Sequence, residues 1–163
     1  MKFKVKRREV TGAHVVPLNF TGGHNDGAVV LSLFDMYDPS TRTWTTLPDA
    51  NVPRDHTGGA VVRDRFGRDL FCVAGGRLSN GTFPDAYLNL VLPTECYNFQ
   101  TRVWQTHPSI PTGRAGASYG TTCDGKLMVA GGEIQGSGRR PPSLNTVEVY
   151  DGTSWSTEPS LVQ

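Results

Sequence analysis

Two arginines occupy the same place in two similar stretches of this sequence. Arg54 follows Trp44 by ten positions, and Arg114 follows Trp104 by ten positions. A guanidinium group binds a carboxylate or phosphate through two parallel hydrogen bonds, so repeated arginines around an opening could clamp an acidic ligand. The alternative is that both arginines bond to backbone carbonyls of neighbouring repeat units. We favour this alternative, because a residue that recurs in a repeat fold is usually architectural.

Side chains that could perform catalysis are present but are not grouped. No serine stands in a setting that we interpret as catalytic. The histidines are scattered without the spacing of a metal site, at His14, His24, His56 and His107. The cysteines are odd in number and lack the CxxC spacing of a zinc site. We therefore expect no cofactor, no metal and no enzymatic activity.

Two of the cysteines, Cys72 and Cys96, lie on segments that we expect to pair as strands. A disulfide between them is conceivable in an oxidising compartment. We favour buried free thiols, which are the common state of cysteines in buried strands. Two N-x-S/T acceptor sequences begin at Asn19 and Asn80, and they favour a secreted protein only slightly, since such triplets also arise by chance.

The arginines belong to a longer repeat. Tyr37 precedes Trp44 by seven positions, Tyr97 precedes Trp104 by seven, and Tyr150 and Trp155 begin a third copy. A glycine pair follows each arginine further along the chain, at Gly75-Gly76 and at Gly131-Gly132. A period above fifty residues indicates one supersecondary unit used several times, each copy packing on the next.

Composition favours β structure and gives no sign of a nucleic-acid or membrane protein. The chain has 163 residues with a net charge of +1, and its 19 glycines and 11 prolines suit turn-rich strands. No apolar run approaches the ~18 residues needed to cross a bilayer. The basic segment 1–8 alternates like a strand at a sheet edge, which we prefer to a nucleic-acid-binding tail.

The best-preserved unit predicts four strands in sequence order, an antiparallel meander. The expected segments are 58–62, 69–74, 94–98 and 103–105. The next unit repeats the pattern at 115–120, 126–130 and 146–150, and then at Trp155. The first unit is incomplete, because only residues 11–21 are left for the two strands ahead of Gly22.

A glycine pair, then a tyrosine, a tryptophan and a Pro-x-Arg or Gly-Arg sequence: this pattern resembles the kelch repeat. The stretch from Phe34 to Trp44, followed by Pro53-Arg54, is an especially close match. The resemblance covers about residues 20–158. It implies an all-β fold, a partial β-propeller of about three four-stranded antiparallel blades. The expected segments are an incomplete first blade at 1–50, with its basic edge, and further blades at 51–109 and 110–163.

The resemblance also implies roles for the repeated residues. The glycine pairs would let the backbone adopt unusual dihedral angles or approach a neighbouring strand closely. Large aromatic side chains would fill the space between blades. The residues expected to pack in this way are Tyr37, Trp44, Tyr97, Trp104, Tyr150 and Trp155.

Kelch proteins typically bind ligands on the face built from loops between the second and third strands and between blades. In this chain those loops are 77–93 and 133–144, together with the junctions that hold Arg54 and Arg114. We interpret Phe83 and Tyr87 as candidates for partner contact, and Arg139 and Arg140 as a basic, proline-stiffened loop. The full set of binding candidates is Arg54, His56, Arg77, Phe83, Tyr87, Arg114, Glu133, Arg139 and Arg140.

We therefore expect a non-catalytic protein-binding platform. Kelch propellers usually close with five to seven blades, so we expect a fragment, or a chain whose propeller is completed by another copy or by another protein. One alternative is a fragment of a secreted copper oxidase like galactose oxidase, a group that uses a cysteine cross-linked to tyrosine. The neighbours Cys96 and Tyr97 argue against it, since adjacent strand residues point to opposite faces. A second alternative is a structural subunit of a larger assembly.

Overall fold

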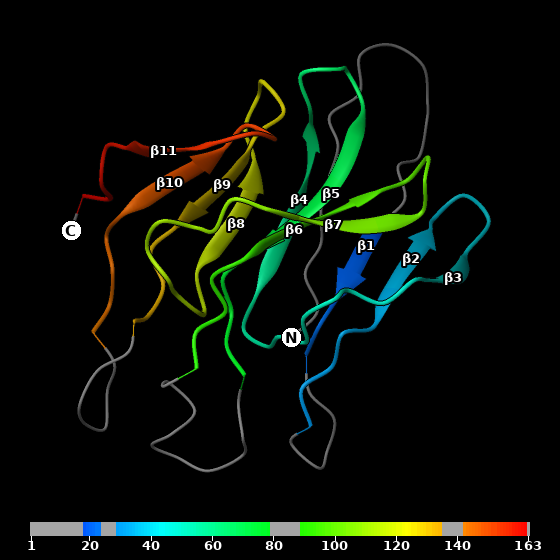
Figure 1. The fold of residues 1–163 in the computed structure, drawn as a ribbon, viewed down its shortest axis with the longest axis horizontal. Helices are drawn as coiled ribbons and strands as arrows, with labels where there is room; N and C mark the ends of the chain where they lie inside the picture. Colours follow the sequence, from blue (N-terminus) through cyan, green and yellow to red (C-terminus); the bar gives the residue numbers. More distant parts are fainter. Residues whose placement is uncertain (1–17, 24–28, 79–88, 135–141, 163) are drawn as a thin grey trace.

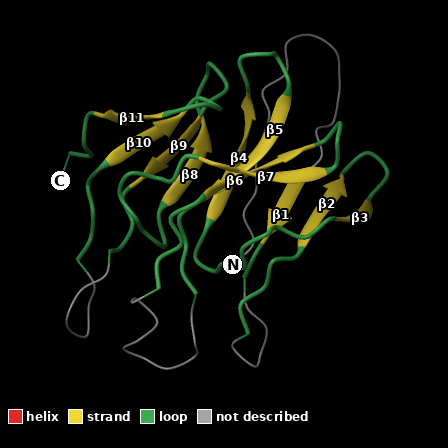
Figure 2. Cartoon of the chain, viewed as in Figure 1, coloured by secondary structure: helices red, strands yellow, loops and turns green. Residues whose placement is uncertain are grey.

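The computed structural model describes residues 18–23, 29–78, 89–134 and 142–162, and every regular element in these ranges is a β-strand (Figure 2). The strands form three antiparallel sheets, which we call the N-terminal, middle and C-terminal blades. The N-terminal blade contains β1 (Leu18–Thr21), β2 (Phe34–Asp38) and β3 (Thr43–Leu47). The middle blade contains β4 (Gly58–Arg63), β5 (Asp69–Ala74), β6 (Thr94–Asn98) and β7 (Val103–His107). The C-terminal blade contains β8 (Ser118–Thr121), β9 (Leu127–Ala130), β10 (Val147–Tyr150) and β11 (Trp155–Glu158).

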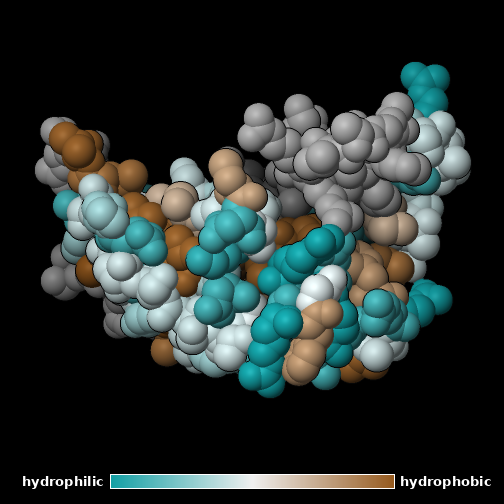
Figure 3. Space-filling model, turned by 90° about the horizontal axis from the view of Figure 1, so that it is seen from above, coloured by the Kyte–Doolittle hydropathy of each residue, from teal (hydrophilic) through white to brown (hydrophobic). Residues whose placement is uncertain are grey.

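The predicted all-β meander is confirmed. Neighbouring strands in each sheet are consecutive in the sequence, and the three sheets stand side by side (Figure 1). Seen from above, the molecule has a curved outline (Figure 3). Within the described residues the N-terminal blade has three strands rather than four. The basic segment 1–8 lies outside the described residues. Among the residues that the structure describes, no helix is long and apolar enough to cross a membrane.

The glycine pairs end the second strand of each four-stranded blade. Gly75 and Gly76 follow β5 with φ of +65° and +94°, in the left-handed region that glycine adopts without a steric penalty. A Cβ on Gly76 would lie 2.8 Å from the backbone oxygen of Asp55. Gly131 and Gly132 repeat both features after β9. The pairs therefore turn the chain and allow the next linker to approach closely.

Aromatic packing joins the N-terminal and middle blades. The Phe34 ring stacks on Phe71 with centroids 5.2 Å apart and meets the edges of Tyr97 and Trp104 at 4.9 and 5.0 Å. All four side chains are buried. Large aromatic rings thus fill the space between these blades, as the repeat predicts.

The expectation for Trp44 is wrong. Trp104 is 6% exposed, whereas Trp44 is 54% exposed. Both tryptophans lie on the outer strand of their blade, opposite a tyrosine. The difference arises because Trp104 packs against the preceding blade, while Trp44 lies on the flank of the N-terminal blade.

The expectation of free thiols is also wrong for Cys72 and Cys96. The two residues are direct cross-strand partners on β5 and β6, and their sulfurs are bonded. Both are buried, while Cys123 is a free, exposed cysteine. The antiparallel register places the two side chains opposite each other on one face of the sheet. Such bonds persist in oxidising compartments.

Candidate functional site

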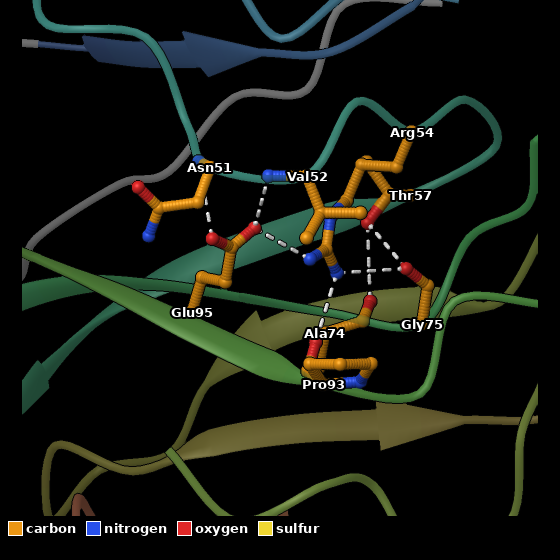
Figure 4. A network of polar contacts seen from close by, with 8 residues as sticks. All are labelled: Asn51, Val52, Arg54, Thr57, Ala74, Gly75, Pro93 and Glu95. Carbon is orange, nitrogen blue, oxygen red and sulfur yellow. Dashed lines mark hydrogen bonds and ion pairs between the residues drawn. The ribbon is translucent and has the colours of Figure 1, made fainter. Parts of the chain in front are cut away.

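Arg54 is buried at the junction between the N-terminal and middle blades (Figure 4). Its Nη1 donates to the backbone oxygens of Gly75 and Pro93, at 3.1 and 3.2 Å. Its Nη2 donates to Glu95 Oε2 at 2.7 Å. Burial lowers the pKa of Arg54, and the charge of Glu95 opposes that shift.

Glu95 fastens the linker that enters the middle blade. Its carboxylate accepts hydrogen bonds from the backbone nitrogens of Asn51 and Val52, at 3.1 and 3.2 Å, besides the bond from Arg54 (Figure 4). Glu95 itself is fully buried on β6. A buried carboxylate with three donors is compensated for the loss of water.

The same network recurs one blade further on. Arg114 Nη1 donates to the backbone oxygens of Gly131 and Thr146, at 3.0 and 2.8 Å. Its Nη2 donates to Glu148 Oε2, and Thr112 Oγ1 donates to the other oxygen of that carboxylate. We call these two buried networks the arginine joints.

The joints account for both arginines that the sequence offered as ligand clamps. Arg54 and Arg114 are 1% and 0% exposed, and their Nη atoms already donate to oxygens of the same blade. They are therefore not accessible to clamp a carboxylate or phosphate ligand. Their position supports the architectural interpretation, with bonds to the blade that each linker enters.

The residues next to the joints form a second cluster. Arg77 Nε lies 3.3 Å from Asp55 Oδ1, and the same oxygen is 2.8 Å from His56 Nδ1. His56 Nε2 lies 3.0 Å from Arg77 Nη2. Asp55 and Arg77 are buried, while the His56 side chain is 40% exposed. The cluster therefore presents the partly exposed imidazole of His56, supported by the buried charged side chains of Asp55 and Arg77.

These contacts settle which nitrogen of His56 carries the proton. A carboxylate only accepts, so Nδ1 donates to Asp55, and a guanidinium only donates, so Nε2 accepts from Arg77. Both ring nitrogens are thus engaged within the protein. The lone pair that a general base would use is already bonded to Arg77, so the cluster is suited to holding the ring in place rather than to proton transfer.

His56 also has a backbone conformation that is unusual for its residue type. Its φ is +48°, in the left-handed region, and the equivalent residue of the C-terminal blade is Gly116 at +62°. Gly116 donates its N–H to the backbone oxygen of His56 at 2.8 Å. The two equivalent positions are therefore adjacent, with a glycine in one blade and a strained histidine in the other.

The C-terminal blade repeats the backbone of this cluster with different side chains. Asp55 and Arg77 exchange two backbone hydrogen bonds of 2.9 and 3.0 Å, and Ala115 and Glu133 exchange two of 3.0 and 2.8 Å. Glu133 is partly exposed. We call the six equivalent positions the rim: Asp55, His56, Arg77, Ala115, Gly116 and Glu133.

The other sequence-derived candidates do not join the rim. Phe83, Tyr87, Arg139, Arg140 and Asn80 lie outside the described residues. Asn19 is 3% exposed on β1, so its amide is not accessible to a glycan in this fold. In the part of the chain that the structure describes, no three His, Cys, Asp or Glu side chains are grouped as metal ligands.

Sequence reasoning missed two features of the site. An acidic residue stands two positions before the tyrosine of every repeat, at Asp35, Glu95 and Glu148, and this spacing could have identified the carboxylates of the joints. The segment 116–120 reads Gly-x-Ser-x-Gly, the pattern of a nucleophile elbow. Ser118, however, is the first residue of β8 rather than part of a turn from a strand into a helix, so it lacks the strained setting of that motif.

Comparisons with known proteins agree with this geometry. The family model described as Kelch motif matches residues 21–51. The Kelch-like protein terF of Aspergillus terreus is 30% identical over 139 residues, which is 84% of this chain and 27% of that protein. The chain is built of kelch repeats. Its blades have the fold of a kelch-type β-propeller, and the solved structure of YjhT matches with a TM-score of 0.67 at 17% identity, over 93% of this chain and 55% of YjhT.

Another relative is named as an enzyme. The N-acetylneuraminate epimerase of Pasteurella multocida is 28% identical over 145 residues, which is 73% of this chain and 37% of that protein. This kelch chain thus spans about a quarter to a third of the length of these two curated relatives.

Proposed function

We propose that this kelch-repeat chain is a non-catalytic platform for binding another protein, and that the rim contributes to the contact surface. The observation that carries the proposal is the contrast between the joints and the rim. The joints use the same arginine and glutamate in both blades, while the rim side chains change completely on an unchanged backbone. Positions that the fold does not dictate are available for recognition.

The conformation of His56 supports the same proposal. A non-glycine residue in the left-handed region costs on the order of 1 kcal/mol, and such strain is concentrated at functional sites. Gly116 meets the same backbone requirement without that cost. The backbone at this place therefore does not require a histidine. The loop candidates Phe83, Tyr87, Arg139 and Arg140 stay predictions as further contacts.

A photo-crosslinking experiment tests the proposal. A photoreactive amino acid replaces Glu133 on the rim in one variant and Phe66 in the other. Phe66 lies in the hairpin between β4 and β5, at the opposite end of β5 from Arg77, and it is 67% exposed. After irradiation in extracts of cells that express the protein, we expect a distinct protein adduct from the rim variant only. The same adducts from both variants would contradict a rim-specific partner.

A second candidate function is suggested by the epimerase relative. A reaction at a sugar ring carbon needs groups that give and take protons, and His56 offers no unengaged ring nitrogen. We therefore expect no acceleration of N-acetylneuraminate mutarotation, followed by proton NMR. An acceleration that His56→Gln abolishes would establish the enzymatic function instead.

The copper-oxidase alternative has less support. Its cysteine–tyrosine cross-link needs a free thiol, and the Cys96 sulfur is bonded to Cys72. Copper analysis of the purified protein tests this point: we expect no stoichiometric copper, and one equivalent of bound copper would favour the oxidase.

A further inference from the structure

A cavity of about 240 Å³ lies where the middle and C-terminal blades meet. It is lined by the hairpin between β4 and β5, by the strand β7 and by the turn between β10 and β11. Its lining residues are all different from those of the rim and of the arginine joints. Its polar side chains include those of Arg65, Arg68, Gln105, His107 and Thr153.

One position of the lining is apolar at the other blade contact. His107 is the last residue of β7 and pairs with the first residue of β6, and Leu47 has the same place on β3, opposite the first residue of β2. Leu47 belongs to the buried apolar core. His107 is partly exposed, and its Nδ1 lies 2.6 Å from Tyr150 Oη. The repeat therefore accepts a leucine at this position, and the imidazole is particular to the contact that has the cavity.

A second position of the lining has lost an aromatic ring. Asn98 and Asp151 begin equivalent turns, because the Oδ1 of each accepts hydrogen bonds from the backbone nitrogens two and three positions further on. The next residue is Phe99 in one turn and Gly152 in the other. The Phe99 ring is partly buried and packs on Tyr97 with centroids 5.3 Å apart. The absence of a side chain at Gly152 leaves space at the contact that has the cavity.

The hairpin between β4 and β5 brings positive charge to this space. The Asp64 carboxylate is buried, and it accepts hydrogen bonds from Arg68 Nε at 2.8 Å and from the backbone nitrogens of Phe66 and Arg68, both at 2.9 Å. The Arg65 guanidinium lies 4.8 Å from the centroid of the Phe66 ring, and it forms no ion pair with the residues that the structure describes. The lining thus has two guanidinium groups and one carboxylate that is already engaged.

The polar groups of the lining suit a tetrahedral oxyanion. They come from three separate segments of the chain, so they approach the cavity from different directions. A phosphate or sulfate group has three acceptor oxygens that point in different directions, and guanidinium groups bind such oxygens through charge-assisted hydrogen bonds. Sites for drug-sized ligands have about 300–1,000 Å³, so this smaller cavity suits a small molecule.

We propose that the cavity between the middle and C-terminal blades binds a small molecule through a phosphate or sulfate group. Arg65 and Arg68 provide the positive charge, and Gln105, His107 and Thr153 provide further polar contacts to the oxyanion. The site uses no residue of the rim, so the proposal is independent of the proposed function.

An NMR titration tests the site. Inorganic phosphate, sulfate and acetate are each added to the chain at constant ionic strength in chloride, and the backbone amide signals of Gly152 and Thr153 are followed. We expect saturable shifts from phosphate or sulfate at both residues and none at Gly116 on the rim. The affinities of the two oxyanions show which group the site prefers. Signals that saturate with neither oxyanion, or that acetate moves equally, would overturn the proposal.

Substitutions in the lining test its chemistry. Arg65→Gln changes an exposed side chain and should weaken binding of the preferred oxyanion about tenfold. His107→Leu copies the residue of the other blade contact and should also weaken it. Arg102→Gln is the matched control, because Arg102 is an exposed arginine of the turn between β6 and β7 and does not line the cavity, so the affinity should stay unchanged. An affinity that neither lining variant changes, or equal losses in Arg65→Gln and Arg102→Gln, would overturn the proposal.

Discussion

The middle and C-terminal blades have the same backbone at the rim and different side chains on it. Arg54 and Arg114 beneath the rim make equivalent bonds to a glycine oxygen and a buried glutamate. Directly beside them, Asp55, His56 and Arg77 are replaced by Ala115, Gly116 and Glu133, while the paired backbone bonds are retained. Because one fold is built twice in one chain, the positions that stay constant reveal what the blade requires, and the positions that change reveal what it does not.

The largest expected effect concerns the arginine joints, which are the same in both blades. Glu95→Ala and Glu148→Ala each leave a buried arginine without its carboxylate, and this typically costs about 3–5 kcal/mol of unfolding free energy. We expect similar losses in the two blades, measured by urea denaturation. Glu158→Ala removes an exposed carboxylate and should cost less than about 0.5 kcal/mol. A loss below about 1 kcal/mol at either joint would show that the joints are not architectural.

The next effect concerns a difference inside the sheets. The middle blade has the Cys72–Cys96 bond where the C-terminal blade pairs Met128 with Val149. Reducing the bond frees a closed loop in the unfolded chain and should lower the unfolding free energy by about 2–4 kcal/mol. The loss is measured with and without reductant, with Cys123→Ser as the parent chain. An unchanged unfolding midpoint in reductant would mean that the two cysteines pack as well without the bond.

A smaller effect tests whether every difference between blades is functional. His107 ends β7 where Glu158 ends β11, and its Nδ1 lies 2.6 Å from Tyr150 Oη. Burial lowers the pKa of His107 below its usual 6.5, although the charge of Asp64 opposes this shift. Since the folded protein then binds the proton less readily than the unfolded chain, the stability contribution is complete above pH 6.5 and is lost as pH falls through the lowered pKa.

We therefore expect His107→Gln to reduce the loss of stability between pH 7 and pH 5 and to leave partner capture unchanged. The measurement is urea denaturation at several pH values. An unchanged pH dependence in His107→Gln would contradict the role of burial, and a loss of capture would extend the functional surface beyond the rim.

The smallest effect is expected from exchanging the rim itself. Replacing Asp55 by Ala, His56 by Gly and Arg77 by Met together removes both members of a buried charge pair without adding a new charge, which is often close to neutral. We expect a change within about 1 kcal/mol. Arg77→Ala alone leaves the buried Asp55 without that guanidinium and should cost more than the triple exchange. A triple exchange that costs more than the single one would show that the rim stabilises the blade.

The sequence predicts the strand limits, which depend on residue patterns over a short range of the chain. Strands β5 and β6 coincide with their predicted limits, because both are specified locally. An apolar run that ends at a glycine pair specifies β5, and an alternating segment that ends before the turn at 100–102 specifies β6. The exposure of Trp44 could not be predicted, since it depends on what packs on its flank rather than on its own repeat. The bond between Cys72 and Cys96 depends on strand register, which spacing alone does not specify. The His56 cluster joins a linker to the end of β5, 21 residues away in the sequence, and becomes visible only in the fold.

The central claim is that the rim serves binding and not folding, and His56→Gly tests it most directly. The substitution gives the middle blade the glycine that the C-terminal blade already has at this backbone conformation. The unfolding free energy and the yield of the rim adduct, formed with the photoreactive residue at position 133, are measured on the same preparation. We predict an unfolding free energy within about 1 kcal/mol of wild type and an adduct yield lower by on the order of tenfold. An unchanged yield, or a yield that falls only together with stability, would contradict the claim.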